Sequence, residues 1–353
     1  MKKKNVLKIF HLPDDMGMRA YSLSRSEKVL SLDSQMIVRR RGVHDSAWVK
    51  PLQSSNKLVF FWKLLKAFIS TLKADVIMAN NGASLLDFSR FHLDLLDIRI
   101  YKFLGKKIIV TYQGCDVRMC RDCPIRDSLS SNEKCVNCPP QYSYADFDRI
   151  KRRRLNIWLR YADAVLGITP DLCRVEGVKY TPHAKLVQQN LKKNKKKDGK
   201  IFIAHPPKPQ IKGTDKIEEE ICKLVKEYPN TVEYVSISGL SWKECQKVLS
   251  DCDIVVDQIL YGWYGGISVE AALLGTLPIA YIDSDLLRFI PENMRNNLPV
   301  YSIFNKDELF GTLRRLIKDR ELLARETLRC HKSAMKFHEG KAVSKFLIKE
   351  YYE

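Results

Sequence analysis

The sequence contains no run of about 18 apolar residues, so no helix is predicted to cross a membrane. Its first apolar stretch, residues 6–12, is too short for the core of a signal peptide and includes Lys8. We therefore expect a cytoplasmic protein whose cysteines stay reduced.

Acidic residues are too few to balance the basic ones. The chain has 60 Lys and Arg residues against 41 Asp and Glu residues, which leaves a formal net charge of +19. This excess predicts an anionic partner. The partner could be nucleic acid, a phosphate-bearing substrate or the anionic face of a membrane. Because 45% of the residues are hydrophobic, general disorder is excluded.

Short apolar runs alternate with helical patterns along the 353 residues, a length that predicts two domains. Strands are expected at residues 5–10, 74–79, 106–112 and 162–168, and again at 201–205, 232–237, 253–257 and 276–282. Nearly continuous apolar strands separated by helices are typical of parallel sheets. The sequence thus predicts an α/β protein with two Rossmann-like, doubly wound domains that face each other across a cleft.

The predicted domains are divided by a lysine-dense segment at residues 191–200. Residues 1–188 would form the first domain and residues 200–335 the second. Residues 336–353 are expected to form a helix that crosses back to the first domain.

A glycine-rich turn follows the strand expected at 253–257. Gly265 and Gly266 open a helix whose N-terminus offers free N–H groups and a partial positive charge to a diphosphate. Glu270 lies one turn further on, where its carboxylate can accept hydrogen bonds from ribose hydroxyls. The pattern predicts a nucleotide site.

A second element of the same kind follows the strand expected at 201–205, where Lys208 and Lys212 can neutralise phosphates. Taken together, Lys212-Gly213, Gly265-Gly266 and Glu270-Ala271 resemble the nucleotide-sugar-binding half of GT-B glycosyltransferases, closest to the retaining family 4.

The resemblance implies the GT-B fold and a hexosyltransferase that retains the anomeric configuration without a divalent metal in the reaction. The donor would be a UDP- or GDP-sugar, and the acceptor a surface glycan that we expect to be lipid-linked. The implied donor-binding groups are Gly17, Lys208, Lys212, Gly265, Gly266, Ile267 and Glu270. Lys212 would also stabilise the leaving diphosphate.

One position departs from the family pattern. The family usually has an acidic residue eight positions before the ribose glutamate, and Gly262 stands there in this chain. Asp257 is a nearby candidate to hold the donor sugar instead. The departure leaves open a catalytically weak protein that only binds a nucleotide sugar.

The acceptor side is expected after the strand at 106–112. Gln113, Cys115, Asp116 and Arg118 resemble a His-Gly-Ser-Asp-x-Arg stretch of some relatives, with the Asp and Arg retained. Asp116 and Arg118 are therefore candidates for acceptor binding or for assistance to hydroxyl deprotonation. The alternative is that they only hold the loop.

Two Cys-x-x-Cys pairs lie within the segment 115–140. They are Cys120 with Cys123 and Cys135 with Cys138, and four thiolates at this spacing can bind Zn²⁺ tetrahedrally. Four protein ligands make a closed, structural site. An iron–sulfur cluster and free thiols are the alternatives.

Basic clusters in the first half predict docking onto anionic phospholipid at the inner face of a membrane, with a solvated surface as the alternative. The clusters are residues 2–4, 39–41 and 151–154. A zinc knuckle beside a basic helix also suggests nucleic-acid binding. Aromatic stacking residues are not interleaved with the basic run, so we expect no nucleic-acid partner.

Overall fold

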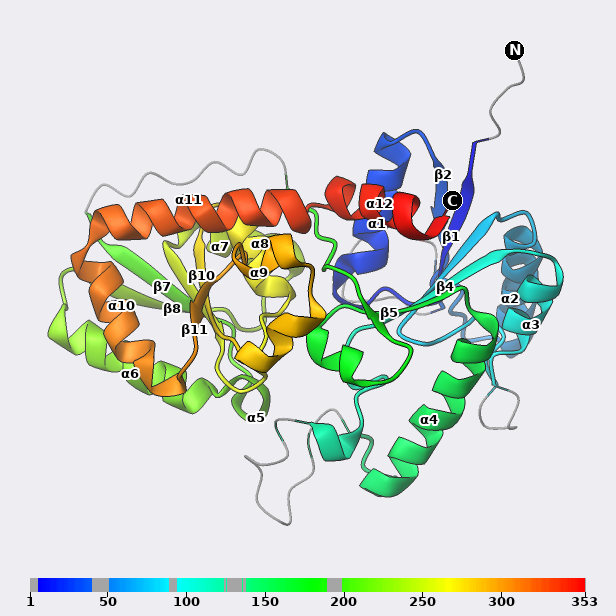
Figure 1. The fold of residues 1–353 in the computed structure, drawn as a ribbon, viewed down its shortest axis with the longest axis horizontal. Helices are drawn as coiled ribbons and strands as arrows, with labels where there is room; N and C mark the ends of the chain where they lie inside the picture. Colours follow the sequence, from blue (N-terminus) through cyan, green and yellow to red (C-terminus); the bar gives the residue numbers. More distant parts are fainter. Residues whose placement is uncertain are drawn as a thin grey trace. The chain divides into compact units, whose positions relative to one another are not determined.

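The protein is described by a computed structural model that covers residues 6–39, 51–88, 94–123, 125, 135, 138–188 and 199–352. The chain divides into two compact units. Unit 1 comprises residues 1–121, 138–184 and 340–353, and unit 2 comprises residues 122–137 and 185–339. Each unit is a parallel β-sheet covered by helices (Figure 1). The two predicted Rossmann-like domains are therefore confirmed.

Unit 1 is built on a six-stranded sheet with the order β2-β1-β3-β4-β5-β6. Its strands are β1 (Lys8–Leu12), β2 (Asp33–Met36), β3 (Val76–Asn80), β4 (Lys107–Tyr112), β5 (Ala164–Gly167) and β6 (Lys179–Tyr180). Its helices are α1 (Arg19–Val29), α2 (Lys57–Thr71), α3 (Leu96–Phe103), α4 (Tyr144–Tyr161) and α12 (Gly340–Leu347).

Alternate residues of the central strands point to opposite faces of this sheet. In β4, Ile108 and Val110 belong to the core cluster that contains residues of α2, α3 and α4. Ile109 belongs to the cluster that contains residues of α1 and α12. Because parallel crossovers are right-handed, α2, α3 and α4 share one face once the chain has crossed from β2 to β3.

The last residues of the chain are held in unit 1 by a buried polar cluster. Glu27 accepts hydrogen bonds from Ser34 Oγ at 2.6 Å and from Tyr352 Oη at 2.8 Å, and its Oε2 lies 2.7 Å from His11 Nε2. Burial opposes ionisation of Glu27, but these partners hold its pKa below the usual value. The contact between Glu27 and Tyr352 spans 325 positions of sequence.

Unit 2 has a five-stranded parallel sheet with the order β11-β10-β9-β7-β8. Its strands are β7 (Ile201–His205), β8 (Val232–Ser236), β9 (Ile254–Gln258), β10 (Leu277–Tyr281) and β11 (Tyr301–Ile303). Its helices are α5 (Pro209–Lys212), α6 (Thr214–Glu227), α7 (Trp242–Asp251), α8 (Gly266–Leu273), α9 (Glu292–Arg295), α10 (Leu309–Lys318) and α11 (Arg320–Phe337).

Three strands and three helices were not predicted from the sequence: β2, β6, β11, α3, α5 and α9. β2 and β11 are short edge strands, and β2 carries Asp33, Ser34 and Gln35, so no apolar run marks it. Among the described residues, no helix has the length and apolarity needed to span a membrane.

Candidate functional site

The glycine turn after β9 is held by a buried carboxylate. Asp257 accepts hydrogen bonds from Lys212 Nζ at 2.7 Å, Gly265 N–H at 2.6 Å and Ser268 Oγ at 2.7 Å. Burial opposes ionisation of Asp257, but the Lys212 ammonium and the hydrogen bonds hold its pKa below the usual value. With no exposed surface, Asp257 is not free to hold a donor sugar, so that sequence-based idea does not fit.

Glu270 is fixed by donors from three separate segments. Its Oε1 accepts a hydrogen bond from Lys185 Nζ at 2.6 Å, and its Oε2 accepts from Trp242 Nε1 at 3.1 Å and from Gln246 Nε2 at 3.3 Å. The Glu270 side chain is 8% exposed and that of Lys185 is 7% exposed. The carboxylate therefore has one orientation, set by a buried ion pair.

Lys185 also lies against the first turn of α8. A Cβ atom on Gly266 would come within 2.8 Å of Lys185 Cε and Nζ, so a larger residue there would require the end of the Lys185 side chain to move. The N–H group of Gly265 is occupied by Asp257, which does not match its predicted use for a phosphate. Gly266 and Ile267 open α8, and their N–H groups lie beyond the reach of intrahelical acceptors. These amides and the Lys185 ammonium make the α8 N-terminus attractive to an anion.

His205 fixes the loop after β7, which carries Lys208, through a chain of hydrogen bonds. His205 Nδ1 lies 2.7 Å from the Val256 carbonyl oxygen, and because a carbonyl can only accept, Nδ1 is the donor. The other ring nitrogen, Nε2, therefore accepts a hydrogen bond from Thr214 Oγ1 at 2.9 Å. Thr214 Oγ1 accepts in turn from the Lys208 N–H at 2.8 Å. Burial lowers the pKa of His205, which keeps the ring neutral. The Lys208 side chain stays exposed.

Gly262 cannot be replaced by an acidic residue in this turn. Its φ is +70°, in the left-handed region, and an added Cβ would lie 2.7 Å from Asp283 Cβ. The Asp283 N–H donates to the Gly262 carbonyl at 2.9 Å. A carboxylate from the turn after β10 therefore stands next to the position where the resembling family has one.

The predicted Gly17 turn lies between β1 and α1 in unit 1. Gly17 and Met18 have φ values of +63° and +62°, and Asp15 Oδ1 accepts a hydrogen bond from the Ala20 N–H at 2.9 Å. A left-handed conformation suits glycine at position 17.

Asp116 and Arg118 occupy a tight turn at the carboxyl end of β4. Asp116 accepts hydrogen bonds from the N–H groups of Gln113 and Gly114, the shorter at 2.7 Å. Burial raises the pKa of the Asp116 carboxyl although these amides oppose the shift. Arg118 Nε donates to Asp171 at 2.6 Å. These contacts match the alternative in which both residues hold the loop.

The cysteine segment is only partly described. Cys120 Sγ and Cys138 Sγ lie 3.8 Å apart, far beyond disulfide length, and Lys151 Nζ lies 3.4 Å from Cys120 Sγ. Two sulfurs on one tetrahedral Zn²⁺, with Zn–S bonds of about 2.3 Å, would be about 3.8 Å apart. No group of three or more ligand side chains is assembled within the described ranges, so the predicted four-thiolate site is not shown.

Three of the four residues of the basic run at 151–154 form ion pairs inside unit 1, and the predicted role of the run at a membrane is not shown. Lys151 is buried, forms an ion pair with Asp148 at 2.8 Å and donates to the Arg118 carbonyl. Arg153 pairs with Asp94, and Arg154 pairs with Asp87 at 2.6 Å and with Asp94 at 3.5 Å. Of the other predicted clusters, residues 2–4 and 40–41 lie outside the described residues.

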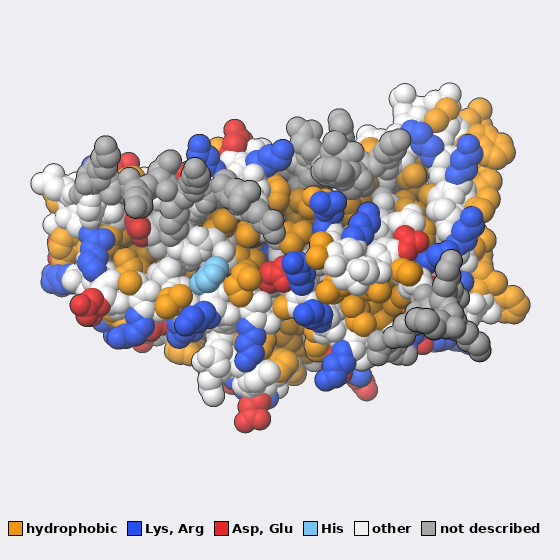
Figure 2. Space-filling model, turned by 90° about the horizontal axis from the view of Figure 1, so that it is seen from above, with side chains coloured by type: hydrophobic (Ala, Val, Ile, Leu, Met, Phe, Trp, Pro, Cys, Tyr) orange, Lys and Arg blue, Asp and Glu red, His pale blue; other side chains and the backbone are white. Residues whose placement is uncertain are grey.

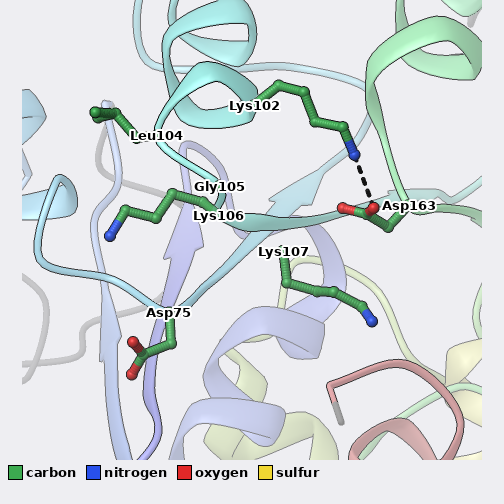
Figure 3. Close-up of a pocket in the computed structure, with 7 residues that line it drawn as sticks. All are labelled: Asp75, Lys102, Leu104, Gly105, Lys106, Lys107 and Asp163. Carbon is green, nitrogen blue, oxygen red and sulfur yellow. Dashed lines mark hydrogen bonds and ion pairs between the residues drawn. The ribbon is translucent and has the colours of Figure 1, made fainter.

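Unit 1 contains a hollow of about 320 Å³ (Figure 3). It lies at the amino ends of the strands, whereas Asp116 and Arg118 follow the carboxyl end of β4. Its lining residues are Asp75, Lys102, Leu104, Gly105, Lys106, Lys107 and Asp163. These residues precede or begin β3, β4 and β5. Ligands of such sheets bind at the carboxyl ends of the strands, so this hollow is not the nucleotide site.

Comparison with known proteins finds similarity in structure only. No protein-family model matches the chain, and no curated protein matches it in sequence. A glycosyltransferase from Rickettsia africae ESF-5 matches with a TM-score of 0.57 at 11% identity, over 98% of this chain and 97% of its own.

Two further solved structures match over nearly the full length. An α-glucosyltransferase in complex with UDP-glucose and DNA containing an abasic site has a TM-score of 0.56 at 12% identity, over 97% of this chain and 98% of its own. A sucrose-phosphate synthase from Thermosynechococcus elongatus has a TM-score of 0.53 at 12% identity, with the same coverage. At these identities the likeness shows the fold, which is GT-B.

Proposed function

We propose that the protein is a glycosyltransferase that moves a sugar from a nucleoside-diphosphate sugar to a glycan acceptor. The observation that carries the proposal is the arrangement after β9. An immobilised carboxylate, Glu270, lies one turn inside a helix whose open N-terminus is flanked by the ammonium of Lys185. A nucleoside diphosphate needs these two features together, an anion site and an acceptor for ribose hydroxyls.

In this proposal Glu270 binds the ribose and the α8 N–H groups of Gly266 and Ile267 bind the diphosphate. Lys208 and Lys212 approach from the loop after β7, with Lys212 oriented by its pair with Asp257. Their positive charge would stabilise the leaving diphosphate in the transition state, so no metal ion is required for that step. Retention of the anomeric configuration is part of the proposal.

The acceptor side is assigned to unit 1. Gly17 is proposed to contribute to donor binding, and Asp116 and Arg118 to shape the acceptor loop after β4. Because the Asp116 pKa is raised, this carboxyl is better suited than an ordinary aspartate to take up a proton from an acceptor hydroxyl. We propose a lipid-linked glycan as the acceptor.

We further propose that Asp283 supplies the carboxylate that the family pattern places at position 262. Its Cβ lies 2.7 Å from where a Cβ atom of residue 262 would lie, so the Asp283 side chain begins beside that position. A carboxylate there can orient a hydroxyl of the donor sugar.

Asp283→Asn is expected to lower kcat by about 10- to 100-fold, because a hydrogen bond to a charged group contributes about 1.5–3 kcal/mol and about 1.4 kcal/mol is a factor of ten in rate. Asparagine keeps the oxygen that caps the following turn, where Asp283 Oδ1 accepts from the Asp285 N–H at 3.0 Å, so folding should be retained. Asp285→Asn on the same turn is the matched control and should leave kcat unchanged. Equal rates for wild type and Asp283→Asn would remove Asp283 from the site.

Donor binding is tested by thermal shift with a panel of UDP-, GDP-, ADP- and dTDP-sugars. One class of donor should raise Tm, because a ligand at 100 times its Kd stabilises the folded state by about 2.7 kcal/mol. Acceptor candidates in the same series should include glycolipids and duplex DNA. A donor that binds but never turns over would favour the catalytically weak alternative.

We propose that Cys120, Cys123, Cys135 and Cys138 bind one structural zinc ion. The support is their spacing in the sequence and the distance of 3.8 Å between the sulfurs of Cys120 and Cys138. The proposal concerns local folding and not the transfer reaction.

Metal analysis of the purified protein should find about one zinc per chain, as expected for four thiolate ligands. Cys123→Ser and Cys138→Ser should each lose the metal and lower Tm, whereas Cys222→Ser, an exposed cysteine on α6, should do neither. Iron with a visible absorption band would instead indicate an iron–sulfur cluster, and unchanged Tm in both serine variants would exclude a structural metal.

A further inference from the structure

Helix α2 exposes apolar side chains on the face that points away from its sheet. Leu58, Trp62 and Ile69 are 73%, 60% and 52% exposed, and their spacing places them on one side of the helix. Leu64 and Ala67 on the other side are buried in the core. Exposed apolar side chains that gather on one side of a helix mark an interaction surface, so the outer side of α2 calls for a partner.

Helix α3 continues this surface. The two helices pack together through Tyr101, whose ring centroid is 5.9 Å from that of Phe68 and whose Oη is 2.6 Å from Thr71 Oγ1. Phe103, at the end of α3, is 89% exposed, the most of any large apolar side chain in the described ranges. The α2–α3 face is defined here by six exposed residues, Leu58, Trp62, Ile69, Ile100, Phe103 and Leu104. Figure 1 draws the two helices side by side.

The charged side chains of α2 are all basic. Residues 57–74 contain no Asp or Glu, and Lys57, Lys63 and Lys66 are exposed on α2. None of the three is ion-paired within the part of the chain that the structure describes. Figure 2 shows one face of the molecule, on which blue Lys and Arg side chains lie among orange apolar side chains.

The basic hollow of Figure 3 adjoins the same face, because Leu104 lines it. In that hollow Lys102 is paired with Asp163 at 2.8 Å, and Asp75 accepts from the Lys8 N–H at 2.8 Å. Lys106 and Lys107 form no direct ion pair within the described residues, although the charge of Lys107 also acts on Asp163. Their ammonium groups can therefore neutralise phosphate groups that lie beside the apolar face.

We propose that the α2–α3 face inserts into the headgroup region of an anionic phospholipid bilayer. Exposed Trp, Phe and Leu side chains flanked by lysines, without acidic residues, are typical of interfacial membrane helices. A protein partner would need its own acidic surface opposite every lysine, whereas an anionic bilayer provides this charge everywhere. The surface does not depend on the proposed transfer reaction, and it differs from the basic run at 151–154.

Co-sedimentation with phosphatidylcholine vesicles, with and without phosphatidylglycerol, tests the proposal on the full chain. Wild type should bind the anionic vesicles, and Trp62→Ser combined with Phe103→Ser should lower the partition coefficient at least about tenfold through lost apolar burial. Lys63→Gln combined with Lys66→Gln should lower it by about fivefold per lysine at low salt. That lysine effect should fade at high salt.

Matched controls come from unit 2. Leu328→Ser removes a 52% exposed apolar side chain from α11, and Lys226→Gln combined with Lys247→Gln removes two exposed lysines; vesicle binding should not change in either variant. Bromine-labelled lipids should quench tryptophan fluorescence in wild type and much less in Trp62→Phe, a variant that should still bind.

The proposal is wrong if wild type does not bind anionic vesicles, or if the Trp62→Ser, Phe103→Ser variant binds as well as wild type. It is also wrong if wild type forms a dimer and does not bind vesicles, and the Trp62→Ser, Phe103→Ser variant is a monomer. That result would make the α2–α3 face an interface between two copies of the chain.

Discussion

Replacing Glu270 with alanine is expected to weaken nucleotide-sugar binding by about 100-fold or more, measured by isothermal titration with the preferred donor. The carboxylate is held by Lys185, Trp242 and Gln246 in one orientation, so a bound ribose would meet a preorganised acceptor. Hydrogen bonds to a charged group contribute about 1.5–3 kcal/mol each, and about 1.4 kcal/mol is a factor of ten in affinity. Loss of two such bonds exceeds 100-fold.

The same variant should also be less stable, since it leaves the Lys185 ammonium buried without a partner. Breaking a buried ion pair costs about 3–5 kcal/mol, whereas replacing both partners by apolar residues is often neutral. Lys185→Met combined with Glu270→Met is therefore the control. It should regain the stability lost by Glu270→Ala and still fail to bind the donor. Donor binding by the double variant at wild-type affinity would exclude Glu270 as the ribose ligand.

Asp257→Ala is expected to lower the stability of unit 2 by about 3–5 kcal/mol, the cost of removing one partner of a buried pair. The change would leave Lys212 Nζ, the Gly265 N–H and Ser268 Oγ without their shared acceptor. Hydrogen exchange of the β9 amides measures this loss in the unit concerned. Lys212→Met combined with Asp257→Leu is the matched control and should recover much of it. Protection of β9 within about 1 kcal/mol of wild type in Asp257→Ala would contradict the account.

The pH dependence of this stability follows from the lowered pKa of Asp257. A carboxyl whose pKa is depressed by folding stabilises the folded state fully above the pKa of the unfolded chain, about 3.9. This contribution is lost as the pH falls from there through the lower pKa of the folded state. Asp257→Asn should lack that component of the acid transition.

The sequence was sufficient to predict the local elements that form the candidate site. The strand expected at 253–257, the glycine turn and the helix after it correspond to β9 and α8 within one residue, because apolar runs and glycines mark their ends. The Pro139-Pro140 break likewise predicts a helix over residues 144–161, which is α4, and in the structure Ser143 caps it by accepting a hydrogen bond from the Asp146 N–H.

Ion pairs between residues that are distant in the chain could not be predicted from the sequence. Lys212 meets Asp257 across 45 positions and Lys185 meets Glu270 across 85, and nothing near Lys185 in the chain distinguishes it from a surface lysine. Likewise, a run of four basic residues suggested a free surface, although Lys151 and Arg154 are taken up by carboxylates from other segments. Charge alone does not reveal its partner, because ion pairs are decided by tertiary packing.

The central claim is tested most directly by the release of nucleoside diphosphate from a panel of nucleotide sugars, with wild-type protein and glycolipid acceptors. The account predicts release from one class of donor, faster with acceptor than without it, and lost in Glu270→Ala. If the protein neither binds nor cleaves any nucleotide sugar of the panel, while correctly folded, the proposed glycosyltransferase activity is contradicted.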